Sequence, residues 1–163
     1  MSKKTRFRHV LGCDDVRFSV PPDFTKNKRP RGSRRAGLSF ERGVGEVLEW
    51  EFGDMVLHSP WISYKDVRYG KRVCCPDFLV VDVIKGIVTV VECKLSHVKD
   101  AWVQINKVYK PVVEKLFPGF RVRGIEICKH FEVCKPYPVE PVIVMRLRQE
   151  FSGGDNVMVM SDV

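Results

Sequence analysis

Apolar residues recur along the chain with two different periods, and the changes of period divide it into helices and strands. From residue 39 to residue 52 they recur every three or four positions, which predicts an amphipathic helix with Ser39 as its N-cap. The same spacing from 99 to 117 predicts a second helix, which Pro111 is expected to kink or split. One helix is therefore expected on each side of a strand-rich middle.

β-branched and aromatic residues predict strands between and after these helices. The segment 55–64 is expected to form a strand interrupted at Pro60, with 67–73 as its partner. Further strands are expected at 121–128 and 139–147. The order of helix, β-meander, helix and strand predicts an α/β domain built around a mixed sheet.

The most informative segment runs from Cys75 to Leu95 and predicts a β-hairpin. Two β-branched runs flank Lys85-Gly86, a turn signal, and both are apolar on both faces, as covered strands are. With the turn centred there, position 77 faces position 94. Because side chains alternate along strands, Asp77, Glu92 and Lys94 then project from one face, for any loop of two or four residues.

Charge separates the chain into two parts. Residues 1–35 contain eleven basic and three acidic residues and so carry the whole net charge of +8, while 36–163 contain 17 of each. We expect 1–35 to be a basic, partly flexible arm (mobile over 1–12, irregular and a candidate to dock on the body over 13–24, an exposed linker over 25–36), 36–150 a globular domain, and 151–163 a flexible tail. A basic arm on a neutral body is typical of polyanion binders. The candidate phosphate contacts are Lys28, Arg29, Arg31, Arg34 and Arg35.

Composition excludes a membrane span, because there is no run of 18 apolar residues. No apolar stretch near the start is long enough for a secretory signal, so a reducing compartment and thiol cysteines are expected. A structural zinc site at Cys128, His130 and Cys134, completed by Cys13 or His9, is the alternative. It lacks a paired CxxC, and a buried thiol is the favoured interpretation.

Two carboxylates and an amine on one face of an apolar hairpin are costly to bury without compensation. Lys94 offsets one charge, and a hard cation such as Mg²⁺ offsets the rest, with Asp77, Glu92 and the backbone carbonyl of Cys93 as ligands. Lys94 would then orient or help to deprotonate a water for attack on a phosphodiester. In the alternative interpretation, Asp77 ends a turn and Glu92–Lys94 is an ion pair at the sheet edge.

These residues also resemble a known family. Pro76-Asp77, fourteen intervening residues and then Glu92-Cys93-Lys94 are similar to the motif of the PD-(D/E)xK phosphodiesterase (restriction-endonuclease-like) superfamily. The resemblance covers residues 36–128. It implies an α-β-β-β-α-β core, with a central mixed sheet flanked by helices, and metal-dependent nuclease activity.

The family usually adds a carboxylate from the helix before the sheet. Here the resemblance assigns that role to Glu41, with Glu46 as the alternative because the helix phase is open by a residue or two. The layout of Glu41 with the two apolar residues on its helix face, followed by Pro76-Asp77, resembles bacteriophage junction-resolving endonucleases. Those enzymes are small, basic and dimeric, and they act on branched DNA.

Exonuclease branches of the family place a Gln and a Tyr four residues apart near the metal. Here Gln104 and Tyr109 are five apart, so the chain departs from that pattern. Gln104 remains a candidate contact to the nucleic acid, and Tyr109 lies on the apolar stripe and is expected in the core. The departure counts against an exonuclease.

Together these features predict a Mg²⁺-dependent endonuclease, with Mn²⁺ able to substitute, that hydrolyses DNA and has branched or Holliday-junction DNA as its candidate substrate. A homodimer is the candidate assembly. The expected location is the cytoplasm of a bacterial or phage-infected cell, or the nucleus if the host is eukaryotic. The alternatives are a non-catalytic nucleic-acid-binding protein on the same fold, an exonuclease, or an RNA-directed nuclease.

Overall fold

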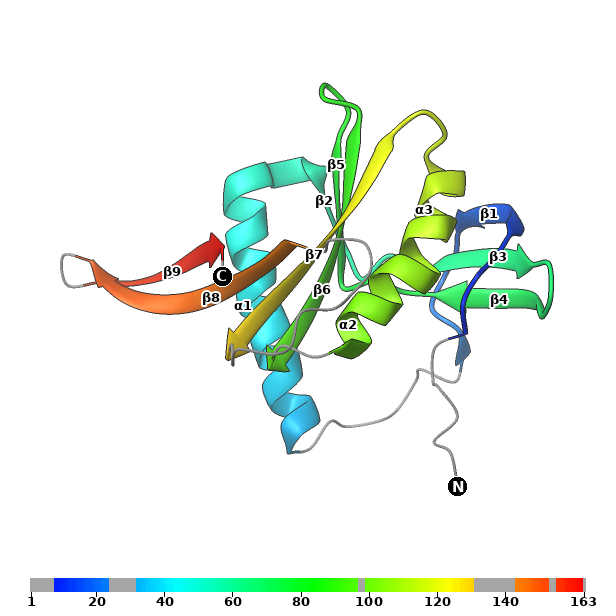
Figure 1. The fold of residues 1–163 in the computed structure, drawn as a ribbon. Coiled ribbons are helices and arrows are strands. Elements are labelled where there is room, and N and C mark those ends of the chain that lie inside the picture. The colour runs from blue at the N-terminus through cyan, green and yellow to red at the C-terminus, as the bar shows by residue number, and fades with distance from the viewer. Residues whose placement is uncertain (1–7, 24–31, 97–98, 131–142, 153–154, 163) are drawn as a thin grey trace.

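The computed structural model describes residues 8–23, 32–96, 99–130, 143–152 and 155–162. The fold is mixed α/β, with a six-stranded sheet and a separate three-stranded sheet (Figure 1). In chain order the elements are β1 (Cys13–Phe18), α1 (Ser33–Phe52), a 3-10 turn (Gly53–Met55), β2 (Val56–His58), β3 (Ile62–Asp66), β4 (Gly70–Cys74), β5 (Phe78–Asp82), β6 (Ile87–Ser96), α2 (Lys99–Gln104), a π-helical turn (Ile105–Tyr109), α3 (Lys110–Leu116), β7 (Arg121–His130), β8 (Ile143–Ser152) and β9 (Asp155–Asp162). Within these ranges there is no helix both long and apolar enough to cross a bilayer.

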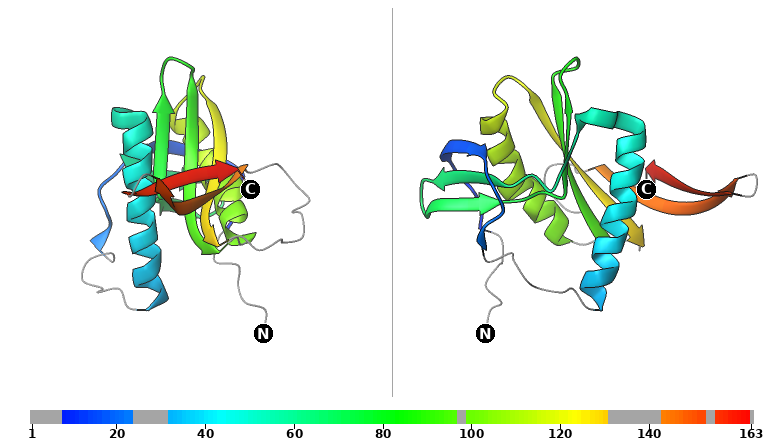
Figure 2. Two further views of the ribbon diagram at one scale, coloured as in Figure 1. Left: turned by 90° about the vertical axis from the view of Figure 1, so that its left-hand side faces the viewer. Right: turned by 180° about the vertical axis from the view of Figure 1, so that it is seen from behind.

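The larger sheet has the order β2-β5-β6-β7-β8-β9 and is mixed, as expected. Its β6-β7 and β7-β8 pairs are parallel, and the other pairs are antiparallel. Helix α1 covers one face, and α2 with α3 covers the other (Figure 2). Because side chains alternate along β6, Val91 packs in the cluster beneath α1, and Val88 and Val90 pack in the cluster beneath α3.

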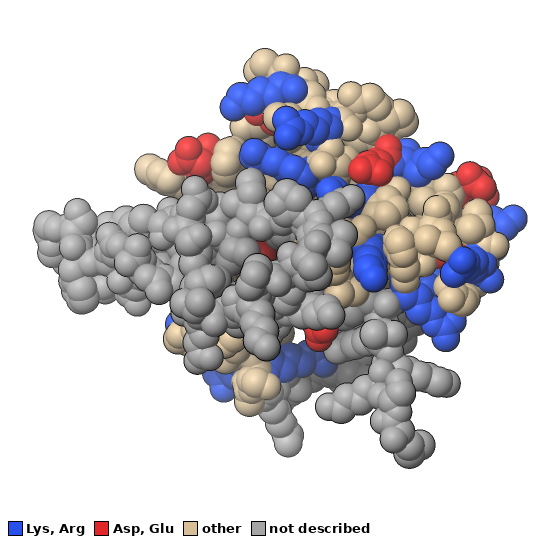
Figure 3. All heavy atoms as spheres, in the orientation of Figure 1, with Lys and Arg blue, Asp and Glu red and all other residues tan. Residues whose placement is uncertain are grey.

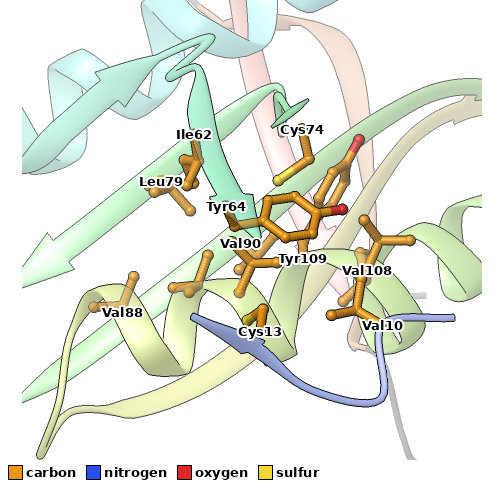
Figure 4. Close-up of a cluster of buried hydrophobic side chains, with 13 residues drawn as sticks. Val10, Cys13, Ile62, Tyr64, Cys74, Leu79, Val88, Val90, Val108 and Tyr109 are labelled. Atoms are coloured by element: carbon orange, nitrogen blue, oxygen red, sulfur yellow. The ribbon is translucent and has the colours of Figure 1, made fainter. Parts of the chain in front are cut away.

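The two sheets share one of these clusters. Cys13, Tyr64 and Cys74 from the small sheet are buried together with Val90 of β6 and Tyr109 (Figure 4). The order of the small sheet is β1-β3-β4, and both of its strand pairs are antiparallel. The small sheet is therefore fixed to the rest of the protein through apolar side chains on its inner face.

The hairpin of β5 and β6 forms, but the predicted pairing was wrong by two residues. Phe78 pairs with Val91, so position 77 is level with position 92 and not with 94. The loop has four residues, 83–86, because the Asp82 side chain accepts a hydrogen bond from the backbone N–H of Lys85 (2.9 Å) and Gly86 adopts a positive φ of 64°. An even loop keeps the predicted faces of both strands.

Helix α1 begins six residues earlier than predicted. Gly32, not Ser39, is the N-cap, and Ser39 lies inside the helix. The segment from Ser33 to Leu38 contains no proline, and its Arg and Ala residues favour a helix. The last residues of the expected basic linker are therefore helical.

The interruption predicted at Pro60 is where the chain changes sheets. Strand β2, before it, belongs to the large sheet, and β3, after it, belongs to the small sheet and pairs with β4 as expected. Ser59 has a positive φ of 42°, and its N–H donates to the carbonyl of Asp77 (2.8 Å). This sharp reversal brings the chain back beside the start of β5.

Two expectations for the ends of the chain were wrong within the described residues. The segment expected to be irregular contains β1, and Val10, in the segment expected to be mobile, is only 2% exposed. At the other end, β9 pairs with β8 where a loose tail was expected. The alternating Val and Met residues after Gly153-Gly154 are a hairpin signal that the composition of the tail obscured.

Pro111 divides the predicted helix, and the irregularity lies before it. Lacking an N–H, Pro111 cannot bond to the carbonyl of Lys107, as a residue four positions later in an α-helix would. That carbonyl instead accepts the backbone N–H of Val10 (2.8 Å), within a π-helical turn over Ile105–Tyr109. The turn inserts one residue between α2 and α3.

The close packing of this turn on β7 depends on Gly124. A Cβ atom at this position would collide with Cγ2 of Ile105, which is fully buried. We expect Gly124→Ala to lower the free energy of unfolding by about 2 kcal/mol, measured by urea denaturation. In an Ile105→Ala background the same substitution should cost much less, and strictly additive effects would contradict the contact.

Candidate functional site

Asp77 and Glu92 lie side by side at the start of β5 and near the end of β6. The register that pairs Phe78 with Val91 places Asp77 level with Glu92 on the face beneath α2 and α3. One carboxylate oxygen of Asp77, Oδ2, accepts the backbone N–H of Cys93 (2.6 Å), which fixes the side chain across the strand pair. The hairpin therefore brings the two carboxylates together, as the alternation of side chains along the strands predicted.

Lys94 contacts the second carboxylate. Its Nζ is 2.7 Å from Oε1 of Glu92, and the Lys94 side chain is 24% exposed whereas that of Glu92 is 4% exposed. The other oxygen of Glu92, Oε2, is buried and has no hydrogen-bond partner among the described residues. An unpaired, buried carboxylate oxygen is costly, so this atom needs a donor or a cation.

Glu41 reaches the same place from α1. It is half-buried, and its carboxylate accepts a hydrogen bond from the Ser59 side chain. Burial, and then the nearby Asp77, raise the pKa of Glu41 to about 7. Glu46, the alternative, is exposed, so of these two residues Glu41 is the carboxylate of α1 that adjoins the hairpin pair.

Burial disfavours the ionisation of all three carboxylates, and repulsion from Asp77 adds to this effect for Glu41 and Glu92. Burial, followed by repulsion from Asp77, raises the pKa of Glu92 to about 8, and Lys94 only partly opposes this. Burial also raises the pKa of Asp77, against the hydrogen bond from Cys93. A cluster of acids that is hard to ionise becomes easy to ionise when a cation enters, which is the electrostatic behaviour of an ion site.

The donors fit a hard cation better than a soft one. The described residues contain no set of three or more His, Cys, Asp or Glu side chains placed to hold a metal. Asp77 and Glu92, with the backbone carbonyl of Cys93, would thus form a sparse oxygen site, and Mg²⁺ retains several waters in such sites. Burial keeps the nearby thiols protonated, since it raises the pKa of Cys75 to about 12.

The alternative zinc site has no support in the described residues. Cys134 lies outside them, His130 is exposed, and the Cys13 thiol donates to the carbonyl of Pro111 (3.8 Å). No disulfide involves the five cysteines that the structure describes, which agrees with the expected thiols. Cys128 is buried in β7.

The π-helical turn brings Gln104 and Tyr109 together despite their spacing of five. Nε2 of Gln104 lies 3.2 Å from the Tyr109 hydroxyl, which donates to the carbonyl of Cys75 (3.3 Å). Both residues are buried, and Oε1 of Gln104 has no partner among the described residues. Gln104 therefore lies in the wall of the site and not at the surface, where a direct contact to nucleic acid was expected.

Sequence reasoning missed two residues here. Ser59 contacts Glu41 through its side chain and Asp77 through its backbone, and the only signal was the Ser-Pro break in a strand. Glu126 of β7 is level with Glu92 in the parallel pair and is 1% exposed. A carboxylate inside the apolar run Gly124–Cys128 was the signal for it.

The predicted phosphate contacts are described only in part. Lys28, Arg29 and Arg31 lie outside the described residues. Arg34 and Arg35 are exposed in the first turn of α1, seven and six residues before Glu41. At 1.5 Å per residue they begin about 10 Å along the helix axis from that carboxylate.

Comparison of the chain with protein-family models, with curated proteins and with solved structures found no match.

Proposed function

We propose that this protein is a Mg²⁺-dependent endonuclease that hydrolyses phosphodiester bonds in DNA, on a restriction-endonuclease-like core. The observation that carries the proposal is the group of Asp77, Lys94 and the buried Glu92 on adjacent strands, with Oε2 of Glu92 unpartnered among the described residues. The order of α1, antiparallel strands, α2 with α3, and the parallel strand β7 supports this core.

Each residue of the group has a distinct task. Asp77 and Glu92 would hold Mg²⁺ together with the Cys93 carbonyl, and Glu41 would support it or a second ion. Bound Mg²⁺ supplies a Lewis acid for the negative charge that develops on the phosphate. Lys94, held at 2.7 Å by Glu92 and partly open to solvent, orients the attacking water and helps to remove its proton.

The basic charge of the chain indicates a polyanionic substrate. The basic residues before and at the start of α1 neutralise phosphates and give affinity that does not depend on sequence. Branched DNA and a homodimer are parts of the proposal that the layout of the chain favours. With Mn²⁺ in place of Mg²⁺ we expect activity to persist, because both ions accept carboxylate and water oxygens.

A substrate panel tests the proposal. The purified protein is incubated with supercoiled plasmid, linear duplex, a four-way junction and structured RNA, each with Mg²⁺, Mn²⁺ or EDTA. We expect nicked circles and cut junctions with either metal and no product with EDTA. Binding without cleavage of any substrate would instead establish a non-catalytic binding protein. Attack only on free ends would indicate an exonuclease, and cleavage of RNA alone an RNA-directed nuclease.

A further inference from the structure

A groove of about 780 Å³ lies on the small sheet, apart from the carboxylate site. Four cationic side chains line it, and we call it the cationic groove: Arg17 of β1, Lys65 of β3, and Lys71 and Arg72 of β4. Among the described residues that line the groove, the acidic one is Asp15. Figure 3 shows Lys and Arg side chains over this side of the molecule, at the right. The groove therefore has a positive potential.

The charges of the cationic groove are not matched within the described structure. Lys65 and Lys71 are directly opposed across β3 and β4, an arrangement that destabilises a sheet. Asp14 of β1 lies opposite Lys65 of β3, but none of the four cations forms a salt bridge with a described residue. Arg72 is less accessible, because it pairs with the core residue Tyr64 and its guanidinium lies 5.5 Å from the centre of the Tyr69 ring. The exposed cations, Arg17, Lys65 and Lys71, are available to an anion from outside.

The cationic groove and the carboxylate site are joined along the chain by the end of β4. Strand β4 ends at Cys74, and Asp77 follows three residues later. Arg72 is five residues before Asp77, so their Cα atoms are at most about 17 Å apart. This is about half of one turn of duplex DNA. A strand with one phosphate at Asp77 can therefore pass through the groove.

The sequence favours a long polyanion over a small one. Pro22 lines the cationic groove, and in the sequence after it one acidic residue, Asp23, is followed by four basic residues within 24–31. A small anion would need few of these charges, whereas a phosphodiester backbone meets many of them in succession.

We propose that the cationic groove binds the phosphodiester backbone of DNA a few nucleotides from the phosphate that lies at Asp77. The inference deepens the proposed nuclease function and rests on it for the position of the strand. The groove holds the substrate in register while the carboxylate site acts on it.

Binding measured in EDTA separates this proposal from catalysis. The full chain and a Lys65→Gln/Lys71→Gln variant are titrated against a fluorescent duplex at several salt concentrations. The control, Lys85→Gln/Arg121→Gln, removes the same number of charges from exposed positions away from the groove, since Lys85 lies in the β5-β6 loop and Arg121 begins β7. We expect the groove variant to bind about tenfold more weakly and its salt slope to shrink by about two, and the control to change by less than about twofold.

Equal losses of affinity in the two variants would overturn the proposal. Polyglutamate of matched charge that competes for the protein as well as DNA does would also overturn it, and would indicate an acidic protein as the partner. Lys65→Arg/Lys71→Arg should retain affinity, and loss of binding there would also contradict a phosphate role. The midpoint of thermal unfolding should stay the same or rise in the Lys65→Gln/Lys71→Gln variant, since both lysines are exposed and the substitution removes the repulsion between them. If the intact protein binds through the groove but never cleaves DNA with Mg²⁺, the nuclease proposal fails and the groove proposal stands.

Discussion

Asp77→Asn is expected to slow DNA cleavage by about a thousandfold, which corresponds to about 4 kcal/mol of transition-state stabilisation. The amide keeps an oxygen that can accept the Cys93 N–H, so the β5-β6 pairing should survive. What it loses is the negative charge that would hold the cation. Single-turnover cleavage of a nicked or branched substrate with Mg²⁺ measures the effect, and DNA affinity in EDTA should not fall.

Asp82→Asn is the matched control, because Asp82 ends the same strand but contacts only the hairpin loop. It should cleave at the wild-type rate. The converse variant, Arg34→Gln/Arg35→Gln, should weaken binding and leave the rate at saturating DNA nearly unchanged. Full activity of Asp77→Asn would remove this residue from the reaction.

Glu92→Gln is expected to stabilise the metal-free protein at about pH 8.5 while abolishing cleavage. The pKa of Glu92 is raised to about 8 and that of Glu41 to about 7, from an ordinary value of 4.5. Between the ordinary pKa and the raised pKa of each group, the folded state binds more protons than the unfolded state. Stability therefore falls as pH rises and is lowest above the folded pKa. Between about pH 5.5 and about pH 8.5, the loss from Glu92 is on the order of 3 kcal/mol.

Urea denaturation in EDTA at about pH 5.5 and about pH 8.5 measures this difference. The wild type should be more stable at the lower pH, and Glu92→Gln should reduce the difference by at least half, because its amide does not ionise. Added Mg²⁺ should stabilise the wild type at the higher pH through preferential binding to the folded state. Wild-type stability that rises with pH over this range would contradict the raised pKa values.

Much of the strand arrangement was predictable because it depends on local pattern. The faces of β5 and β6 follow from the alternation of their side chains, which a four-residue loop preserves. The exact pairing did not follow, because it depends on a hydrogen bond within the loop, from the backbone N–H of Lys85 to the Asp82 side chain. The proximity of Asp77 and Glu92 was therefore predictable, but their being level with each other was not.

Contacts between distant segments were not predictable. Val10 is buried because its N–H finds the carbonyl that Pro111 leaves unused, across about a hundred residues of chain. Ser59 joins Glu41 to Asp77 only because the chain reverses between two sheets. A charged, proline-rich composition also obscured β1, whose inward-facing Cys13 contributes to the core. Such features depend on tertiary packing and leave little local signal.

The π-helical turn has a consequence for how this chain should be compared with others. An extra residue in a continuous α-helix rotates all later side chains by about 100° about the helix axis, so two side chains that would otherwise meet no longer face each other. Here the turn confines the insertion to Ile105–Tyr109, so Gln104 and Tyr109 still meet. A search that demands a fixed count between these two residues will pass over such a chain. Patterns for this helix should permit a spacing of four or five.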